Sequence, residues 1–376
     1  MSDGARVIRA SNQQDQEDNK FNNKTTSYQD KSVKVNRINA LINPLTFAIT
    51  AIVLIVIVLL LQNDLFADRV VVSSTIIAEM AYLSQIFFVV VQLSQVMVEI
   101  VKASVSRKRI DNALAIEPKI VNAANPKTNE VNIGEELIKF ENVSFSFNEN
   151  SDFLSDLNFQ IRKGETFGII GCTGSGKTTV INLIERFYDA SKGTIYYKGI
   201  PIKEYDLKAL RNDIGLVNQK SSLFNGTIKS NYLMSNKNAS DEDIKTALKQ
   251  AEAFEFVSKY EDDINHPVNE GGLNFSGGQR QRLCIGRALV KKPSILILDD
   301  STSALDLLTD KKIRSNIANL KDMTKVIVSQ RVSTIQNADF ILVLEGGQVV
   351  GQGKHDDLLK NCPIYKEIYE TQVKRG

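Results

Sequence analysis

The chain has 376 residues, which is longer than one ordinary domain and therefore indicates two structural units. Its formal net charge of +2, with 24% charged residues of both signs and no long basic run, disfavours a nucleic-acid-binding surface. The three cysteines, Cys172, Cys284 and Cys362, lie far apart without metal-binding spacing, which fits reduced thiols in a cytosolic domain.

The first predicted element is a long polar helix. Residues 5–40 contain no proline or glycine and are rich in Gln, Asn, Asp and Lys, a composition suited to a helix surrounded by water. Disorder is the alternative for such a segment. Because these residues are hydrophilic, we expect no secretory signal peptide at this place in the chain.

Two apolar segments come next, and both predict membrane spans. Residues 41–61 carry no charge and are long enough, at 1.5 Å per residue, to cross a hydrocarbon core of ~30 Å. Residues 76–98 are equally long but include Glu79, Gln85 and Gln92, so we expect a span with a polar side. The alternative for each segment is a buried helix of a soluble protein.

Basic residues flank this pair of predicted spans. The connection between the spans holds only Arg69 as a basic residue. Several lie just outside the pair, namely Lys31, Lys34 and Arg37 before it and Lys102, Arg107, Lys108 and Arg109 after it. Because basic residues accumulate on the cytoplasmic side, we expect a multi-pass protein of the cell membrane with both ends of the pair in the cytoplasm.

A change in the pattern of apolar and polar residues marks the expected domain boundary. Pro118 and Pro126 interrupt the pattern, so residues 118–136 are predicted to be a linker after a partial transmembrane domain, residues 1–117. From Leu137 onward, alternating apolar runs give way to apolar strands that alternate with helical stretches. The expected fold is thus an α-helical membrane segment followed by an α/β domain, residues 137–376, with a largely parallel core.

The stretch GCTGSGKT, residues 171–178, matches G-x-x-x-x-G-K-[ST] at every fixed position. The apolar run ETFGII before it predicts a strand, and TVINLIERF after it predicts a helix. At such a turn, backbone N–H groups converge on phosphate oxygens, Lys177 is expected to pair with the β and γ phosphates, and Thr178 offers its hydroxyl to Mg²⁺. The predicted nucleotide-binding residues are Gly171, Thr173, Gly174, Ser175, Gly176, Lys177, Thr178 and Thr179.

The run SILILDD, residues 294–300, supplies the second half of this predicted site. A hydrophobic parallel strand that ends at Asp299 places a carboxylate beside the Mg²⁺ shell. A core strand with acids at its exposed end is the alternative, which the upstream phosphate loop disfavours.

The stretch NFSGGQRQR, residues 274–282, predicts a helix that begins after Ser276 and runs to about Val290, before Pro293. Its N-terminus presents free N–H groups to an anion, although a serine-capped helix without a ligand has the same pattern. The stretch closely resembles the signature of ATP-binding-cassette (ABC) proteins, with Phe275 in place of the more usual leucine. With the order of the other motifs, the resemblance covers nearly the whole chain.

The resemblance implies further site residues. Phe147 falls where the family stacks an aromatic ring on adenine, and Gln219 matches a glutamine that touches Mg²⁺ and the membrane-coupling surface. Residues 303–306, SALD, match the loop that crosses the interface between two nucleotide domains, and Asp306 is assigned to ATP binding with it. The signature residues Ser276, Gly277, Gly278 and Gln279 are implied to face ATP as well. Residues 4–14 and 102–114 resemble the cytoplasmic helix extensions of bacterial and organellar exporters.

Two residues depart from the family's hydrolysing members. Asp300 stands where they carry a glutamate, and Gln330, in SQRVSTI, stands where they carry a histidine. Aspartate is a methylene shorter, so its carboxylate would sit about 1.5 Å further from the attacking water, and a displacement near 1 Å can cost on the order of 10²-fold in rate. Glutamine hydrogen-bonds but carries no positive charge. The expected catalytic positions Asp300, Gln330 and Gln219 therefore predict a site that binds Mg-ATP and hydrolyses it poorly.

The resemblance also implies a partner, because cassettes pair head to tail with each ATP between one phosphate loop and the other chain's signature. The phosphate loop of this chain would form the weakly hydrolysing ATP site. Its intact signature would complete the competent ATP site, whose phosphate loop belongs to the partner. This pattern predicts a non-identical second half-transporter, and a homodimer is the alternative.

The leading functional prediction is a subunit of an ATP-driven exporter whose cargo, a small molecule, lipid or peptide, the sequence does not define. The family's half-transporter has six membrane helices and only the last two are expected here, so the chain looks like the C-terminal part of one. The alternative is a truncated, non-transporting, membrane-tethered ATP-binding regulatory subunit. A soluble cassette ATPase that acts on DNA or translation is disfavoured by the two spans and the balanced charge.

Overall fold

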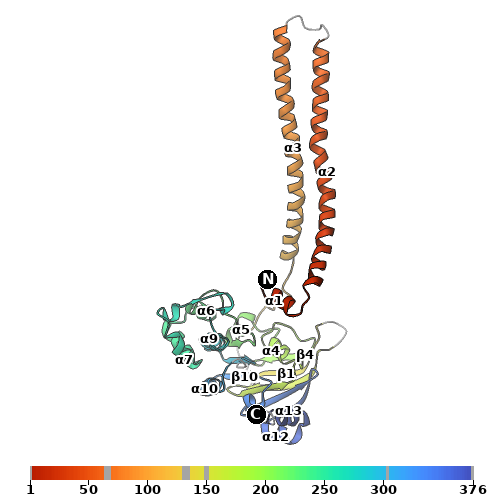
Figure 1. Cartoon of the computed structure of the whole chain (residues 1–376). Helices are drawn as coiled ribbons and strands as arrows, with labels where there is room; N and C mark the ends of the chain where they lie inside the picture. Colours follow the sequence, from red (N-terminus) through yellow and green to blue (C-terminus); the bar gives the residue numbers. More distant parts are fainter. Residues whose placement is uncertain (1, 63–68, 129–135, 148–151, 302–304, 374–376) are drawn as a thin grey trace. The chain divides into compact units, whose positions relative to one another are not determined.

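A computed structural model of the chain describes residues 2–62, 69–128, 136–147, 152–301 and 305–373 (Figure 1). The chain divides into two compact units, residues 1–117 and residues 118–376, and each has its own architecture.

The first unit consists of helices. They are α1 (Ser2–Ala10), α2 (Gln14–Gln62) and α3 (Arg69–Leu114). The polar segment 5–40 is therefore helical, with a break at residues 11–13 where Asn12 adopts a φ of 52°. Asparagine tolerates this left-handed backbone better than most residues. The two long helices lie side by side, and Phe47 of α2 meets Phe87 of α3 edge to face, with 6.2 Å between ring centroids (Figure 1).

Apolar side chains cover the outer surface of this helix pair. The exposed apolar residues include Leu41, Phe47 and Ile52 on α2 and Ile77 and Phe88 on α3. Among the described residues, one helical segment meets the length and hydropathy criteria for crossing a membrane, Ile77–Leu114, with a mean hydropathy of 1.8 and no buried part. The span expected at 76–98 overlaps it, and the span expected at 41–61, inside α2, stays a prediction.

The second unit is built around a six-stranded sheet. Its strand order is β12-β11-β3-β10-β9-β6, and all strands are parallel except β12 at the edge. The five parallel strands are largely apolar because both of their faces are covered, as expected for a parallel core, whereas β12 carries polar and exposed residues. The strands are β3 (Thr166–Gly171), β6 (Ile214–Val217), β9 (Ile295–Asp299), β10 (Thr324–Val328), β11 (Phe340–Glu345) and β12 (Gln348–Gly353).

A second, antiparallel sheet has the order β2-β1-β4-β5. Its strands are β1 (Glu136–Phe145), β2 (Leu154–Arg162), β4 (Lys192–Tyr197) and β5 (Ile200–Pro201). Stacked rings join the two sheets, because Phe159 of β2 lies 4.3 Å from Phe140 of β1 and 5.5 Å from Phe167 of β3, measured between centroids. The sheets therefore share one hydrophobic core.

Helices surround these sheets, and a second group forms a subdomain with its own core around the buried Tyr232. The first set comprises α4 (Lys177–Ile184), α5 (Leu207–Asp213), α10 (Leu307–Ala318), α11 (Val332–Ile335), α12 (His355–Asn361) and α13 (Pro363–Val373). The subdomain comprises β7 (Gly226–Thr227), α6 (Ile228–Ser235), α7 (Asp241–Gln250), α8 (Phe254–Val257), η1 (Asp263–Asn265), β8 (Pro267–Val268), η2 (Glu270–Gly272) and α9 (Gly277–Leu289).

Helix α4 is shorter than the sequence pattern predicts. The apolar periodicity continues to Phe187, but the helix ends at Ile184 and Arg186 adopts a φ of 51°. Arg186 is buried and its Nη2 donates a hydrogen bond to the carbonyl of Val121, 3.1 Å away. A tertiary contact therefore stabilises a turn that local periodicity does not indicate.

Residues 118–128 of the expected linker are attached to the second unit. The side chain of Asn122 contacts the start of α5 twice, since its Nδ2 donates to Asp206 Oδ2 at 2.9 Å and its Oδ1 accepts from the Leu207 N–H at 2.8 Å. The backbone of Lys127 donates to Glu204 O at 2.8 Å and accepts from the Asp206 N–H at 3.0 Å. This part of the linker is therefore fixed in place. Residues 129–135 of the expected linker lie outside the described residues.

Candidate functional site

The order of the central strands brings four distant segments of the chain together. Gly171 ends β3 and Asp299 ends β9, while Gln219 and Gln330 follow β6 and β10. These strands are parallel neighbours, so their carboxyl ends share one edge of the sheet. A pocket of about 180 Å³ lies there. Its lining residues are Phe153, Thr173, Gly174, Gly176, Lys177, Thr178, Thr179, Gln219, Asp299, Asp300 and Gln330.

The phosphate loop folds around its own lysine. Lys177 is 9% exposed, and its Nζ donates to Gly171 O and Cys172 O, each at 2.7 Å, and to Ser175 Oγ at 3.5 Å. Burial lowers the pKa of Lys177, and the nearby charges of Asp299 and Asp300 oppose this effect. Gly171 and Ser175 therefore hydrogen-bond to the Lys177 ammonium group but do not line the pocket themselves, whereas Lys177 does.

Two glycines give this loop its curvature. Gly176 adopts a φ of 101°, and a Cβ at this position would lie 2.4 Å from Leu154 Cδ2, so only glycine fits. Gly174 has a φ of 84°, and a Cβ there would meet no atom within 4 Å. The loop is therefore closely packed at Gly176 and open at Gly174, which leaves a concave space suited to a phosphate group.

Two of the three expected Mg²⁺ ligands, Thr178 and Asp299, are adjacent, and the third, Gln219, lines the same pocket. Thr178 Oγ1 donates a hydrogen bond to Asp299 Oδ2 at 3.2 Å. Burial raises the pKa of Asp299 and the charge of Asp300 adds to this, whereas the Thr178 hydroxyl and Lys177 oppose it. No group of three or more His, Cys, Asp or Glu side chains that could hold a metal occurs among the described residues. A hydroxyl and one carboxylate fit Mg²⁺, which keeps waters and takes substrate phosphate oxygens as its other ligands.

Asp300 lies in the same pocket with an unusual backbone. Its φ is 43°, in the left-handed region, and its N–H donates to Val328 O of β10 at 2.9 Å. Aspartate is among the non-glycine residues that best tolerate this conformation. Gln330, the other departure from the family pattern, lines the pocket from the end of β10 and is exposed. The two unusual residues therefore share one site.

An aromatic cluster lies beside the loop. Phe147 is 55% exposed, and its ring centroid lies 4.8 Å from Phe145, 5.2 Å from Phe153 and 5.6 Å from Tyr188. Phe153 also lines the phosphate pocket, whereas Phe147 does not. The family resemblance pointed to Phe147 and missed Phe153, for which the available signal was a second aromatic residue just before β2, the strand that precedes β3.

The signature stretch lies outside this pocket. Ser276 Oγ accepts a hydrogen bond from the Gln279 N–H at 3.2 Å, and Gln279 Oε1 accepts one from the Ser276 N–H at 2.9 Å, which caps α9. Ser276 and Gly277 are exposed, Gly278 is half-buried, and none of the four signature residues lines the pocket. The structure therefore does not bring the signature onto the phosphate loop of the same chain.

The packing around position 275 accommodates the phenylalanine that replaces the usual leucine of the family. It is buried, and its ring centroid lies 6.3 Å from Tyr260, 6.0 Å from His266 and 6.5 Å from Phe256. The larger side chain thus completes an aromatic cluster under the start of α9.

Asp306 caps α10. Its Oδ1 accepts from the Thr309 N–H at 3.0 Å, and this hydrogen bond lowers the pKa of Asp306. It is exposed and does not line the pocket. Ser303, where the SALD stretch begins, lies outside the described residues.

Known proteins of the ABC transporter family are similar to this chain. The model of the ABC transporter family matches residues 154–303. An ABC transporter ATP-binding protein of Mycoplasma genitalium is 35% identical over 393 residues, which cover 99% of this chain and 62% of that protein. An ATP-dependent lipid A-core flippase of Saccharophagus degradans is 33% identical, with 98% of this chain and 62% of the flippase covered.

A solved structure of a bacterial Atm1-family ABC exporter with ATP bound is also similar. The TM-score is 0.83 at 28% identity, and the match covers 98% of this chain and 65% of that one. The chain spans about 62% of the length of the two relatives named above.

Proposed function

The chain belongs to the ABC transporter family, and from this we propose that it is the ATP-binding part of an exporter that pumps a substrate across the membrane. As is general in the family, its nucleotide domain binds ATP with Mg²⁺. One observation carries the proposal: Lys177, Thr178 and Asp299 line a single pocket that is open at Gly174.

Each pocket residue has a role that follows from its chemistry. The loop N–H groups and Lys177 hold the β and γ phosphates, while Thr178 and Asp299 hold Mg²⁺ with Gln219 nearby. The exposed ring of Phe147 stacks on the adenine, supported by Phe153 and Tyr188 behind it. Bound Mg²⁺ supplies charge neutralisation for the phosphates.

Hydrolysis at this site is slow in our proposal. Asp300 is the residue placed to orient the attacking water, and its side chain is one methylene shorter than the glutamate of hydrolysing members. Gln330 offers hydrogen bonds to the γ-phosphate but no charge for the transition state. Because both lie in one pocket, their effects act on the same step.

The exposed signature supports a partner chain. Ser276, Gly277 and Asp306 are accessible on the surface and do not contact the pocket of their own chain, so another cassette can use them. We propose that this cassette belongs to a non-identical half-transporter whose phosphate loop forms the competent site. Hydrolysis there resets the dimer, while ATP in this chain's pocket stabilises its closed form.

The first unit is the membrane part in this proposal. Its exposed apolar side chains need lipid or neighbouring helices to cover them. Polar residues within the second span, Glu79, Gln85 and Gln92, are candidates for the substrate path or for bonds to neighbouring helices. One relative is a lipid flippase, which keeps lipid among the candidate cargoes with small molecules and peptides. The nucleotide domain lies in the cytoplasm.

Steady-state ATP turnover by the full chain in lipid nanodiscs tests this proposal, once Mg-ATP binding is measured. We expect binding with turnover near 0.1 s⁻¹ or below, since about 10²-fold is lost from an ordinary enzyme rate of about 10 s⁻¹. The variant Lys177→Ala gives the background rate. Turnover of about 10 s⁻¹ by the chain alone would disprove the weak site, and no ATP binding would disprove the whole proposal.

A further inference from the structure

The short helix α11, Val332–Ile335, begins two residues after Gln330. Its N-cap is Arg331, whose side chain makes no capping hydrogen bond. The first N–H groups of a helix have no partner inside the helix and need one from elsewhere. The position of Gln330 therefore depends on whatever holds the start of α11.

Gln372 of α13 supplies this contact. Its Nε2 donates to the carbonyl of Gln330 at 2.7 Å, and its Oε1 accepts from the Val332 N–H at 2.8 Å. The Gln372 amide therefore uses both of its polar atoms, and it binds the backbone of the residues just before and just after Arg331. The paired bonds fix the position and the orientation of the Gln330 peptide, which one bond would not do.

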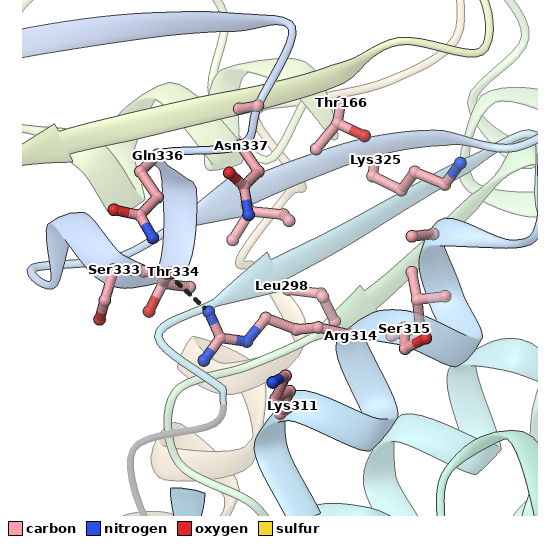
Figure 2. Close-up of a pocket in the computed structure, with 14 residues that line it drawn as sticks. Thr166, Leu298, Lys311, Arg314, Ser315, Lys325, Ser333, Thr334, Gln336 and Asn337 are labelled. Carbon is pink, nitrogen blue, oxygen red and sulfur yellow. Dashed lines mark hydrogen bonds between the residues drawn. The ribbon is translucent and has the colours of Figure 1, made fainter. Parts of the chain in front are cut away.

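A second anchor holds the other side of α11. Arg314 of α10 donates from Nη1 to Ser333 O at 3.0 Å (Figure 2). Its Nε donates to Asp310 Oδ1, within α10, at 3.0 Å. A cavity of about 430 Å³ lies between these helices, lined by Arg314, Ser333 and Leu298 among others (Figure 2). The buried side chains of Val332 and Ile335 pack α11 into the core, and the hydrogen bonds from Gln372 and Arg314 further fix its N-terminal turn.

Gln330 lies between α13 and the phosphate pocket. It lines that pocket, and it also lines a cavity of about 380 Å³ together with Gln372 and the loop residues Gly171 and Cys172. A shift of the Gln330 backbone toward this second cavity would withdraw its side chain from the phosphates.

We propose that Gln372 is a positioning residue for Gln330: it holds the Gln330 peptide so that the side chain faces the end of the phosphate chain. The inference rests on the proposed function, since ATP must occupy the pocket. ATP carries the γ-phosphate that Gln330 faces, so ATP should bind more tightly when α13 is docked. ADP lacks this phosphate, so its affinity should not depend on the docking of α13. By linkage, bound ATP strengthens the docking of α13 in turn.

The test compares equilibrium dissociation constants for Mg-ATP and Mg-ADP in the full chain in lipid nanodiscs. We expect Gln372→Ala to weaken ATP binding about 10-fold, the value of one hydrogen bond to a charged group, and to leave ADP binding unchanged. Gln330→Ala should give the same pattern, and the double variant should lose nothing more, because both changes remove one interaction. Unchanged ADP affinity shows that each variant is folded.

Two further variants sharpen this test. Gln372→Glu keeps the acceptor for the Val332 N–H but places an oxygen against the Gln330 carbonyl, so it should match Gln372→Ala. The matched control is Val373→Ala, a neighbouring exposed residue on α13 that lines neither cavity, which should leave both affinities unchanged.

Several results would overturn the inference: an ATP affinity unchanged in Gln372→Ala, an equal loss for ATP and ADP, or additive effects in the double variant. An unmodified chain that does not bind ATP would overturn the proposed function itself. The unmodified chain thus tests the function, and the variants test the role of Gln372.

Discussion

Thr178 Oγ1 and Asp299 Oδ2 lie 3.2 Å apart although 121 residues separate them in the chain. The contact joins the first turn of α4 to the end of β9, and so links the phosphate loop to the acidic strand end. The hydroxyl and the carboxylate are bonded to each other where Mg²⁺ is proposed to bind. The metal can therefore use both oxygens with little movement of the backbone.

Replacing Asp299 by asparagine should remove the Mg²⁺ dependence of ATP binding. Asparagine keeps the size and an acceptor for Thr178 but loses the charge that attracts the cation. We expect Mg²⁺ to lower the dissociation constant of ATP in the unmodified chain. In Asp299→Asn, the factor by which Mg²⁺ lowers this constant should be about 10- to 100-fold smaller. ATP titrations with Mg²⁺ and with a chelator measure this, with the exposed Asp322→Asn as control. An unchanged response to Mg²⁺ would remove Asp299 from the proposed metal site.

Restoring the family residues at both departures should raise ATP turnover. In Asp300→Glu with Gln330→His, the carboxylate reaches further and a positive charge becomes possible beside the γ-phosphate. We expect turnover to rise by about 10²-fold over the unmodified chain, measured against the Lys177→Ala background. Part of the gain will be offset, because glutamate tolerates a φ of 43° less well than aspartate. A double variant as slow as the unmodified chain would contradict the explanation of the weak site.

Replacing Phe147 by alanine should weaken the binding of ATP and ADP equally. Both nucleotides carry the same adenine, and stacking of a base on an aromatic ring is worth about 1–3 kcal/mol. We therefore expect both dissociation constants to rise at least about 5-fold, as measured by equilibrium titration. Phe224, which is 58% exposed, provides the matched control in Phe224→Ala. If ATP binding alone weakens, Phe147 does not contact the base.

Glu185 should make stability depend on pH. Burial raises the pKa of Glu185 to about 7, against the opposing charges of Arg211 and Lys291, from an ordinary value of 4.5. The folded chain therefore binds this proton more tightly than the unfolded chain. The stabilising contribution is fully present below pH 4.5 and is lost as the pH rises through about 7.

The variant Glu185→Gln resembles the protonated form at every pH. It should match the unmodified chain at pH 4 and exceed its free energy of unfolding at pH 8, by up to about 3 kcal/mol. Chemical denaturation of the full chain across this pH range measures the difference. Glu261→Gln, at an exposed position, controls for the loss of a charge. An equal pH dependence in Glu185→Gln and the unmodified chain would show that Glu185 is not the titrating group.

The parts of the site that the sequence predicted are those with a local signal. Glycine spacing and the change from strand to helix locate the phosphate loop, and parallel strand topology explains why Asp299 meets Thr178. The expected end of the signature helix near Val290 also agrees with α9, which ends at Leu289. Each of these features depends on residues close in sequence or on a general rule of sheet connection.

The parts that sequence reasoning missed depend on tertiary contacts. Gln372 lies 42 residues from Gln330, and nothing in its local sequence pattern distinguishes it from the other glutamines of the chain. The left-handed φ of Asp300 arises where β9 ends against β10. Phe153 gains its importance only because β2 places it beside the loop. Such relationships are decided by packing between elements, which single-sequence patterns do not contain.

The strand order of the central sheet has a consequence for biosynthesis. β3, which carries the phosphate loop at its end, pairs with β10 and β11 and with no strand made before them. At a translation rate of about 5–20 residues per second, β3 waits on the order of ten seconds or more for its neighbours. During that time its apolar residues, Phe167, Ile169 and Ile170, have neither of their final partner strands beside them. The antiparallel strand β2 is made earlier and packs Phe159 on Phe167, so it can cover part of β3 and limit its aggregation before the ATP site forms.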